Sequence, residues 1–405
     1  MMKMIKREIY LNQISRLIDK EPIKVITGVR RSGKTYLLKS IREMLIKKGV
    51  SKENIFLISF ESMRYNRIEN FNQLDNLVLE LTKEVDGRIY LLFDEIQNVE
   101  KWEKSINSYR GDFDCDIYIT GSNSELLSGE MATLIAGRYY QISIYPFSFK
   151  EFLQYKREID GIDISNIDEL FEEYMEFGGM PPIQQVSDED KYSYLDDIFN
   201  TILLKDIITR HDIRSSDMLN RIIDYSIINM AKNFSATNVV KYIRHDNRRI
   251  SKDTVLDYLL YAKNACFIHA VPRNDINGKK VLLHNEKYYL VDHGFYQSKH
   301  GDIENIGSIL ENIVFIELLR RGYDVKTGII NDKEIDFVCT KDKKKMYVQV
   351  AYLLFTDETI EREFSSLSEI NDNFDKYVLS MDRLDFSRNG FKHRNIIDFL
   401  LSDEI

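Results

Sequence analysis

The sequence predicts an α/β protein with a parallel sheet in its N-terminal part, and three observations support this fold class. Five short apolar runs alternate with helical patterns in the first 145 residues, which is typical of a parallel sheet covered on both faces. The runs are rich in β-branched and aromatic residues and occupy positions 24–27, 55–59, 89–93, 116–120 and 140–144. Helical patterns over residues 34–48 and 73–84 separate the first three runs.

Composition restricts the class of protein. A length of 405 residues suggests two or three domains, and 43% hydrophobic residues are ample for more than one core. With only 5 Pro and 18 Gly, the chain is neither collagen-like nor of low complexity. Lys and Arg total 56 and Asp and Glu 65, so the net charge is −9 and nucleic acid would need a local basic patch to bind.

The cysteines and the hydropathy pattern favour a reducing, cytoplasmic location. Cys115, Cys266 and Cys339 lie far apart and form no CxxC pair, so we expect neither a zinc ribbon nor a disulfide framework. No apolar run follows the basic N-terminal residues, so no signal peptide is expected. No uncharged apolar stretch approaches about 18 residues, so we expect no membrane-spanning helix.

The pattern changes after residue 147, where helical periodicity replaces the alternation. The predicted domains are an α/β domain at 1–147, a helical lid at 148–214, a winged-helix domain at 215–300 and a second α/β domain at 301–405. The third prediction depends on the order helix, turn, helix and two-stranded ribbon. The fourth depends on a helix from Ile306, strand-like stretches at 324–327, 334–338 and 346–350, and a helical tail.

Residues 28–35 read Gly-Val-Arg-Arg-Ser-Gly-Lys-Thr and match the phosphate-binding pattern G-x-x-x-x-G-K-[ST]. A predicted strand precedes this motif and a predicted helix follows it, so backbone N–H groups and the helix dipole would face a phosphate. We expect Lys34 to reach the β- and γ-phosphates and Thr35 to bind Mg²⁺. The predicted ATP contacts are Gly28, Arg30, Arg31, Ser32, Gly33, Lys34, Thr35 and Tyr36.

Asp94 and Glu95 end the third apolar run, where a carboxylate would lie opposite the phosphate-binding loop. We expect Asp94 to hold Mg²⁺ through water and Glu95 to act as the general base for the attacking water. The alternative is a solvated acid pair at a strand end. At the end of the next run, Ser122 or Asn123 could orient the attacking water, or the residues could form a plain turn.

Arg138 lies at the end of the preceding helical segment, just before the fifth run. An arginine at this corner could neutralise charge on the transferred phosphoryl group, acting on a neighbouring subunit of a homo-oligomer. The alternative is a solvated surface arginine.

In this order the motifs resemble those of AAA+ ATPases. The chain looks more narrowly like prokaryotic AAA-type ATPases that carry a C-terminal domain of unknown function with a nuclease-like end. The segments that carry this resemblance are 28–35, Phe-Asp-Glu-Ile-Gln at 93–97, Thr-Gly-Ser at 120–122, Tyr-Pro-Phe-Ser-Phe at 145–149 and Phe-Gly-Gly-Met-Pro at 177–181. The resemblance spans nearly the whole chain and implies ATP binding and hydrolysis.

A basic segment covers residues 232–287, with 11 Lys or Arg and 5 Asp or Glu. Its charges gather at two places in the predicted winged helix. Arg244, Arg248, Arg249 and Lys252 lie at the entry to the expected recognition helix, and Lys279 and Lys280 lie in the expected wing. The segment could bind double-stranded DNA through phosphate contacts and groove entry, or it could be a solvated face used for protein contact.

The C-terminal pattern of Glu311, Asp336 and 349–351 resembles a PD-(D/E)xK nuclease core. Gln349 and Ala351 occupy the positions where such a core needs a carboxylate and a lysine. We therefore expect a nuclease-like fold without the full active site, in which Glu334 is a spare acid on the same strand face as Asp336.

Three hypotheses follow from these patterns. The leading one is a Mg²⁺-dependent ATPase whose hydrolysis moves the C-terminal winged-helix and nuclease-like module, acting on DNA. The second is a slow ATP-dependent switch or scaffold that binds protein partners. The third, an ATP-gated nuclease, depends on Asp336.

Overall fold

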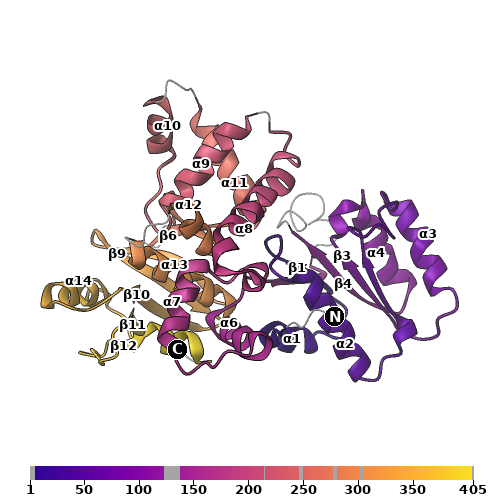
Figure 1. Ribbon diagram of the computed structural model, residues 1–405, viewed down its shortest axis with the longest axis horizontal. Helices are drawn as coiled ribbons and strands as arrows, with labels where there is room; N and C mark the ends of the chain where they lie inside the picture. The colour runs from indigo at the N-terminus through magenta and orange to yellow at the C-terminus, as the bar shows by residue number, and fades with distance from the viewer. Residues whose placement is uncertain are drawn as a thin grey trace. The chain divides into compact units, whose positions relative to one another are not determined.

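The computed structural model describes residues 5–122, 137–213, 215–245, 250–276, 281–300 and 305–403. Five residues singled out from the sequence lie outside these ranges: Asn123, Arg248, Arg249, Lys279 and Lys280. The chain divides into two compact units (Figure 1). The first comprises residues 1–144 with 264–266, and the second comprises 145–263 and 267–405.

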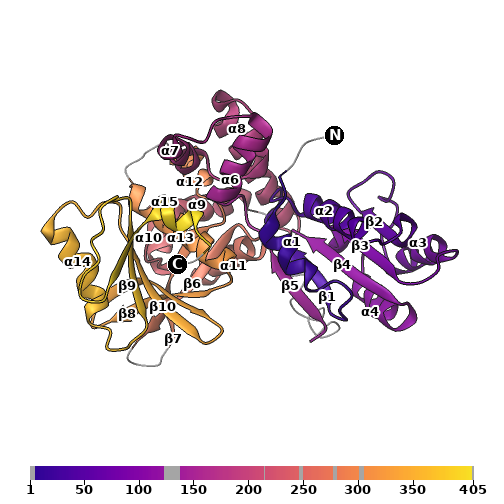
Figure 2. The ribbon, with the colours of Figure 1, turned by 90° about the horizontal axis from the view of Figure 1, so that it is seen from below.

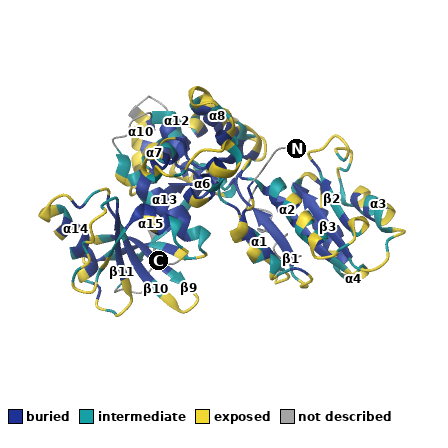
Figure 3. Cartoon of the chain, turned by 60° about the horizontal axis from the view of Figure 1, so that its bottom comes forward, coloured by how far each residue is buried: buried dark blue, intermediate teal, exposed yellow. Residues whose placement is uncertain are grey.

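A five-stranded, all-parallel sheet forms the centre of the first unit, in the order β2-β3-β4-β1-β5. Its strands are β1 (Ile23–Thr27), β2 (Ile55–Ser59), β3 (Ile89–Asp94), β4 (Cys115–Gly121) and β5 (Tyr139–Ser143). Each agrees with a predicted apolar run to within one residue, so the predicted parallel α/β fold of this unit is confirmed. The central strands are buried along their whole length (Figure 3) because helices cover both faces.

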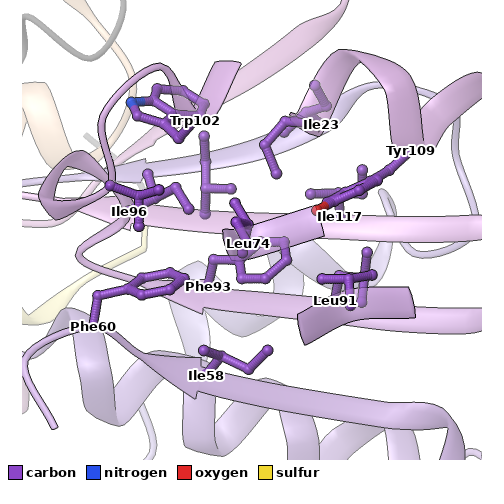
Figure 4. Packing of buried hydrophobic residues seen from close by; sticks show 14 of the residues in the cluster. Ile23, Ile58, Phe60, Leu74, Leu91, Phe93, Ile96, Trp102, Tyr109 and Ile117 are labelled. Carbon is purple, nitrogen blue, oxygen red and sulfur yellow. The ribbon is translucent and has the colours of Figure 1, made fainter. Parts of the chain in front are cut away.

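Helices pack on both faces of this sheet because successive side chains of a strand point to opposite sides. On one face Leu91 and Phe93 of β3 pack with Leu74 and Trp102 (Figure 4). On the other face Leu92 packs in a separate cluster with residues of the first two helices. The elements are α1 (Glu8–Ser15), α2 (Lys34–Lys47), η1 (Lys52–Asn54), α3 (Phe71–Thr82), η2 (Ile96–Asn98) and α4 (Trp102–Asp112).

The second unit begins with helices, as the pattern after residue 147 predicts. They are α6 (Phe149–Tyr155), η4 (Lys156–Asp160), α7 (Ile167–Phe177), η5 (Pro181–Gln185), α8 (Asp188–Thr201), η6 (Ile202–Ile208), α9 (Ser216–Ile228), α10 (Ala236–His245), α11 (Lys252–Asn264) and α12 (Gly294–His300). Three of their starts show side-chain caps, and at α7 Asn166 accepts a hydrogen bond from the N–H of Glu169. Ser148 and Glu151 form a reciprocal capping box at α6, and Ser251 accepts a hydrogen bond from Thr254 N at α11.

A seven-stranded mixed sheet follows, in the order β12-β11-β10-β9-β8-β6-β7. Its strands are β6 (Ile268–Asp275), β7 (Val281–Leu290), β8 (Asp324–Ile330), β9 (Lys333–Lys341), β10 (Lys344–Val350), β11 (Asp375–Ser380) and β12 (Lys392–Asn395). Three helices belong to the same part of the chain: α13 (Ile306–Arg320), α14 (Asp357–Ser368) and α15 (Ile396–Leu401). Figure 2 shows α14 alongside the sheet. The hairpin β6–β7 belongs to the same sheet as β8–β12, so the predicted boundary at 300 does not separate two compact units.

The expectation of a helical tail is wrong for part of the C-terminus. Strand β11 pairs in parallel with β10, and β12 pairs in parallel with β11. The residues of β12, Lys392-His393-Arg394-Asn395, contain no apolar side chain, so no hydropathy pattern marks them as a strand. Pairing with β11, rather than local preference, explains this element.

Candidate nucleotide site

The phosphate-binding motif forms the connection between β1 and α2, as its spacing predicts. Gly28 follows the strand directly, and a Cβ atom at this position would lie 2.3 Å from the carbonyl oxygen of Ile144. Only glycine fits so close to a backbone atom. Gly33 lies in the left-handed region with a φ of 103° and precedes the first residue of α2. The loop is therefore tight, and the N-terminus of α2 faces the inside of the loop.

The side chain of Lys34 is folded into this loop and is only 4% exposed. Its Nζ donates hydrogen bonds to the carbonyl oxygens of Gly28, at 3.0 Å, and Val29, at 3.2 Å. Glu95 Oε1 lies 3.4 Å from the same nitrogen. A buried ammonium group with neutral carbonyl partners is one that phosphate oxygens could recruit.

Asp94 ends β3 and receives hydrogen bonds from three hydroxyl groups. Thr35 Oγ1 lies 2.9 Å from Oδ2, Ser59 Oγ 3.0 Å from Oδ2, and Thr120 Oγ1 2.8 Å from Oδ1. Ser59 and Thr120 come from the carboxyl ends of the strands on either side of β3, where ligand sites of parallel sheets form. Burial raises the pKa of Asp94 above its ordinary value, although the three donors act in the opposite direction.

The oxygen atoms of Asp94 and Thr35 fit a magnesium ion. Mg²⁺ takes oxygen ligands and keeps several waters, so it commonly uses only one or two carboxylates of the protein. The carboxylate of Asp94 and the hydroxyl of Thr35 supply such oxygens at adjoining positions.

Glu95 lies next to Asp94 in an unusual backbone conformation with a φ of 55°. Its N–H donates to Thr120 Oγ1 at 2.9 Å, and its Oε2 accepts a hydrogen bond from Gln97 Nε2. Burial alone would raise the pKa of Glu95, but the charge of Lys34 and the Gln97 hydrogen bond outweigh it, so the pKa lies below its ordinary value. The carboxylate is therefore ionised at neutral pH and able to accept a proton.

The hydroxyl oxygen of Ser32 is buried and has no hydrogen-bond partner in the described part of the chain. Such an atom inside the loop suits a ligand that brings its own polar groups. Arg7 also contacts the loop, because its Nη1 donates to the carbonyl oxygen of Ser32 at 3.0 Å. Arg7 lies outside every motif, and no sequence pattern predicts this contact.

The remaining predicted ATP contacts have other neighbours. Arg30 Nη1 lies 2.9 Å from Glu61 Oε1, Arg31 is exposed, and the ring of Tyr36 lies 4.9 Å from Lys39 Nζ.

The structure does not bring Arg138 to this site. Its carbonyl oxygen accepts a hydrogen bond from the N–H of Ile23, where β1 begins, and its Nη1 lies 3.4 Å from Asn107 Oδ1. Since the loop follows the other end of β1, Arg138 and Lys34 lie at opposite edges of the sheet. Ser122 follows β4 at the correct edge and is buried.

A second charged cluster lies in the C-terminal sheet, where Lys287 of β7 is surrounded by three carboxylates. Its Nζ lies 2.6 Å from Glu334, 3.0 Å from Glu311 and 3.8 Å from Asp336. Tyr289 donates to Glu311 at 2.6 Å. The sequence pattern identified the acids but not Lys287, which comes from a strand outside the predicted nuclease core.

The two positions that depart from the nuclease pattern have structural contacts. Gln349 Oε1 accepts a hydrogen bond from the N–H of Asp336 at 3.3 Å, and Ala351 is buried in a hydrophobic cluster. Among the residues that the structure describes, no group of three or more His, Cys, Asp or Glu side chains is arranged to hold a metal.

The exposed face of α11 carries charges of both signs and large apolar residues. Leu256 and Leu260 are 43% and 48% exposed. Exposed charged residues beside them are Lys252, Asp253, Asp257 and Lys263. This face is not uniformly basic, although Arg244 at the end of α10 is also exposed.

Comparison with known proteins identifies two domains and two relatives. The family model of an AAA domain matches residues 20–153, and that of a domain of unknown function matches residues 168–306. An uncharacterised protein of Haemophilus influenzae is 38% identical over 402 residues, which cover 98% of this chain and 99% of the relative. An uncharacterised protein of Methanocaldococcus jannaschii is 30% identical over 406 residues, covering 98% and 88%.

Solved structures show more distant similarity. The Walker-type ATPase of Pyrococcus abyssi has a TM-score of 0.44 and 16% identity, covering 73% of this chain and 95% of that chain. The Orc1 protein of Aeropyrum pernix in complex with DNA has a TM-score of 0.36 and 10% identity, covering 74% and 93%. Separately, no helix in the described ranges is long and apolar enough to span a membrane.

Proposed function

This chain belongs to one family of AAA-domain proteins with its bacterial and archaeal relatives, and on that premise we propose that it binds Mg²⁺-ATP and hydrolyses it. The observation that carries the proposal is the meeting of Lys34, Thr35, Asp94 and Glu95 at one edge of the parallel sheet. Lys34 and Thr35 begin α2, whereas Asp94 and Glu95 lie at the end of β3, so a chance match to the loop motif does not account for their proximity.

Each of the four residues has a chemical part in the proposed reaction. Lys34 would exchange its carbonyl partners for the β- and γ-phosphates. Thr35 and Asp94 would hold Mg²⁺, whose contribution when bound is to neutralise phosphate charge. Glu95 accepts a proton from the attacking water, whose oxygen bonds to the γ-phosphorus while ADP leaves.

Steady-state phosphate release with Mg²⁺-ATP tests this function. We expect Lys34→Ala to abolish ATP binding and turnover, and Glu95→Gln to lower kcat by about 100-fold or more while ATP still binds. The change at Glu95 keeps the shape of the side chain and removes its basicity. Turnover in Glu95→Gln equal to that of the wild type would remove this residue from the mechanism, and equal turnover in Lys34→Ala would refute the site.

We further propose that nucleotide state is coupled to movement of the C-terminal module. The order α9, α10, α11, β6 and β7 supports a winged-helix arrangement, with α11 at the position of a recognition helix. Double-stranded DNA is one candidate partner, because the segment 232–287 is basic.

A protein partner is the second candidate, and the face of α11 favours it. Leu256 and Leu260 are exposed one helical turn apart, and Asp253 and Asp257 beside them would repel phosphates. The phosphate-release assay separates the two candidates when duplex DNA is added. Stimulation by several-fold would support action on DNA, whereas tight ATP binding with slow, DNA-independent turnover would support a switch that binds protein.

We propose that the cluster around Lys287 stabilises the fold and does not cleave nucleic acid. The ammonium group already compensates the carboxylates of Glu311, Glu334 and Asp336, and Gln349 hydrogen-bonds the backbone. A role of Arg138 in hydrolysis would require a second copy of the chain, because the phosphate-binding loop of the same chain lies at the other edge of the sheet.

A further inference from the structure

Gln97 lies beside the proposed general base, in the short turn η2 that follows β3. Packing determines where this turn lies, because its neighbours Ile96 and Val99 are buried in the core (Figure 4 shows Ile96). The amide Nε2 of Gln97 donates a hydrogen bond to Glu95 Oε2. One end of the Gln97 amide is thus committed to the base.

The other end of the same amide has no partner among the residues that the structure describes. Gln97 Oε1 is buried, and no residue in the described part of the chain donates a hydrogen bond to it. A buried acceptor without a donor costs free energy, so native structures nearly always supply protein or water there. Because Oε1 and Nε2 belong to one planar amide, the free acceptor lies next to the carboxylate of Glu95. A water molecule could donate one hydrogen bond to each.

Gln97 is also the partner that Glu95 would keep during the reaction. The second side-chain partner of Glu95 is Lys34, whose ammonium is proposed to turn toward phosphate. The backbone of Glu95 is held separately, through its N–H to Thr120 Oγ1. A neutral amide can orient the carboxylate without a competing charge.

We propose that Gln97 positions the attacking water, which donates one hydrogen bond to Gln97 Oε1 and one to Glu95. The inference rests on the proposed ATPase function. In the step, the water oxygen bonds to the γ-phosphorus, and the bond from this phosphorus to the β–γ bridging oxygen breaks. The electron pair of that bond leaves on ADP, and one water proton passes to Glu95 and then to solvent. Gln97 gains and loses no proton.

Two variants and one matched control test this role by phosphate release and equilibrium ATP binding. Gln97→Met removes both ends of the amide at nearly constant length, and Gln97→Glu keeps the shape but replaces the donor to Glu95 by a second carboxylate. We expect both to lower kcat by about 10- to 100-fold, while the Kd for ATP of Gln97→Met changes by less than about twofold. Asn98→Met makes the same kind of change at the next residue, which is exposed, and we expect wild-type kcat.

The outcomes distinguish this inference from the function on which it rests. If both Gln97 variants keep kcat within about twofold of wild type while Glu95→Gln is inactive, the role of Gln97 is refuted and the ATPase stands. If Gln97→Met loses as much ATP affinity as kcat, or has a lower unfolding midpoint than the wild type, Gln97 only maintains the fold. A wild-type chain that binds ATP and releases no phosphate would refute both proposals.

Discussion

Gly28 offers the sharpest test, at the scale of one residue, of how the phosphate-binding loop is built. A Cβ atom would lie 2.3 Å from the carbonyl oxygen of Ile144. This oxygen belongs to the backbone, so it cannot move away as the end of a flexible side chain could. We expect Gly28→Ala to weaken ATP binding by at least about 10-fold, equivalent to roughly 1.4 kcal/mol. It should also lower the free energy of unfolding by about 1–3 kcal/mol. Calorimetric titration and urea unfolding measure the two effects.

Gly111→Ala is the matched control for this change. Gly111 lies within α4, and an added Cβ atom there meets no heavy atom within 4 Å. Since alanine favours a helix, we expect unchanged ATP affinity and up to about 1 kcal/mol of added stability. Wild-type ATP affinity in Gly28→Ala would show that the close approach to Ile144 does not shape the loop.

The residues of the proposed site divide according to how they can be recognised. Lys34 and Thr35 belong to a local motif, and Asp94 and Glu95 follow a strongly apolar strand, so the sequence alone suggests all four. The strand-end rule that finds Asp94 would also have found Ser59, which ends β2 in the same way. Arg7 differs, because only the folded chain brings it to the loop.

At the scale of elements, Lys287 joins β7 to β9 and α13. Its side chain is 4% exposed, and it compensates carboxylates that would otherwise be buried without a counter-charge. We expect Lys287→Met to lower the free energy of unfolding by about 3–5 kcal/mol, because removing one partner leaves the remaining charges uncompensated. Urea unfolding of the whole chain measures this change.

Lys333→Met is the control for charge removal in the same sheet. Lys333 pairs with Glu369 at 2.6 Å but is 44% exposed, so its loss should cost less than about 1 kcal/mol. If the two variants lose the same amount, the buried cluster has no special part in stability. Metal-dependent nicking of plasmid by the wild type, absent in Asp336→Ala, would instead restore the nuclease hypothesis.

The two sheets show why strands differ in predictability. The central strands β1, β3 and β4 of the parallel sheet are buried almost throughout, whereas the edge strands β2 and β5 are partly exposed. All five contain short apolar runs, and their bounds are predicted to within one residue. Strand β12 instead has no apolar residue, and only its pairing with β11 accounts for it. The Lys287 cluster also depends on the folded sheet, in which β6 and β8 lie between β7 and β9. No local sequence pattern shows that these strands belong to one sheet.

At the scale of the whole molecule, the two units differ in the groups that titrate near neutral pH. The chain has seven histidines, all between His211 and His393, so the first unit contains none. Mild acid should therefore act mainly on the second unit. Added ATP identifies the unfolding transition of the first unit, because a ligand raises the unfolding temperature of the unit that binds it.

His269 carries the clearest prediction about acid. Its ring lies 5.9 Å from that of Tyr145 and 5.7 Å from that of Phe315, measured between centroids, and its Nε2 has no hydrogen-bond partner among the described residues. Burial, together with the charge of Lys263, lowers the pKa of His269 from 6.5 to about 4. The unfolded chain thus takes up the proton first, so this stability is complete above pH 6.5 and is lost as the pH falls from 6.5 toward 4.

Calorimetry at about pH 7.5 and 5.5 tests this, with His269→Phe as the variant, because phenylalanine can occupy an aromatic environment without titrating. Between these two pH values we expect the second unit to lose about 1 kcal/mol through His269. The variant should lose less than the wild type by that amount, while the transition that ATP shifts should depend on pH equally in both. Identical acid sensitivity of the second unit in the variant and the wild type would mean that His269 is already solvated in the folded chain.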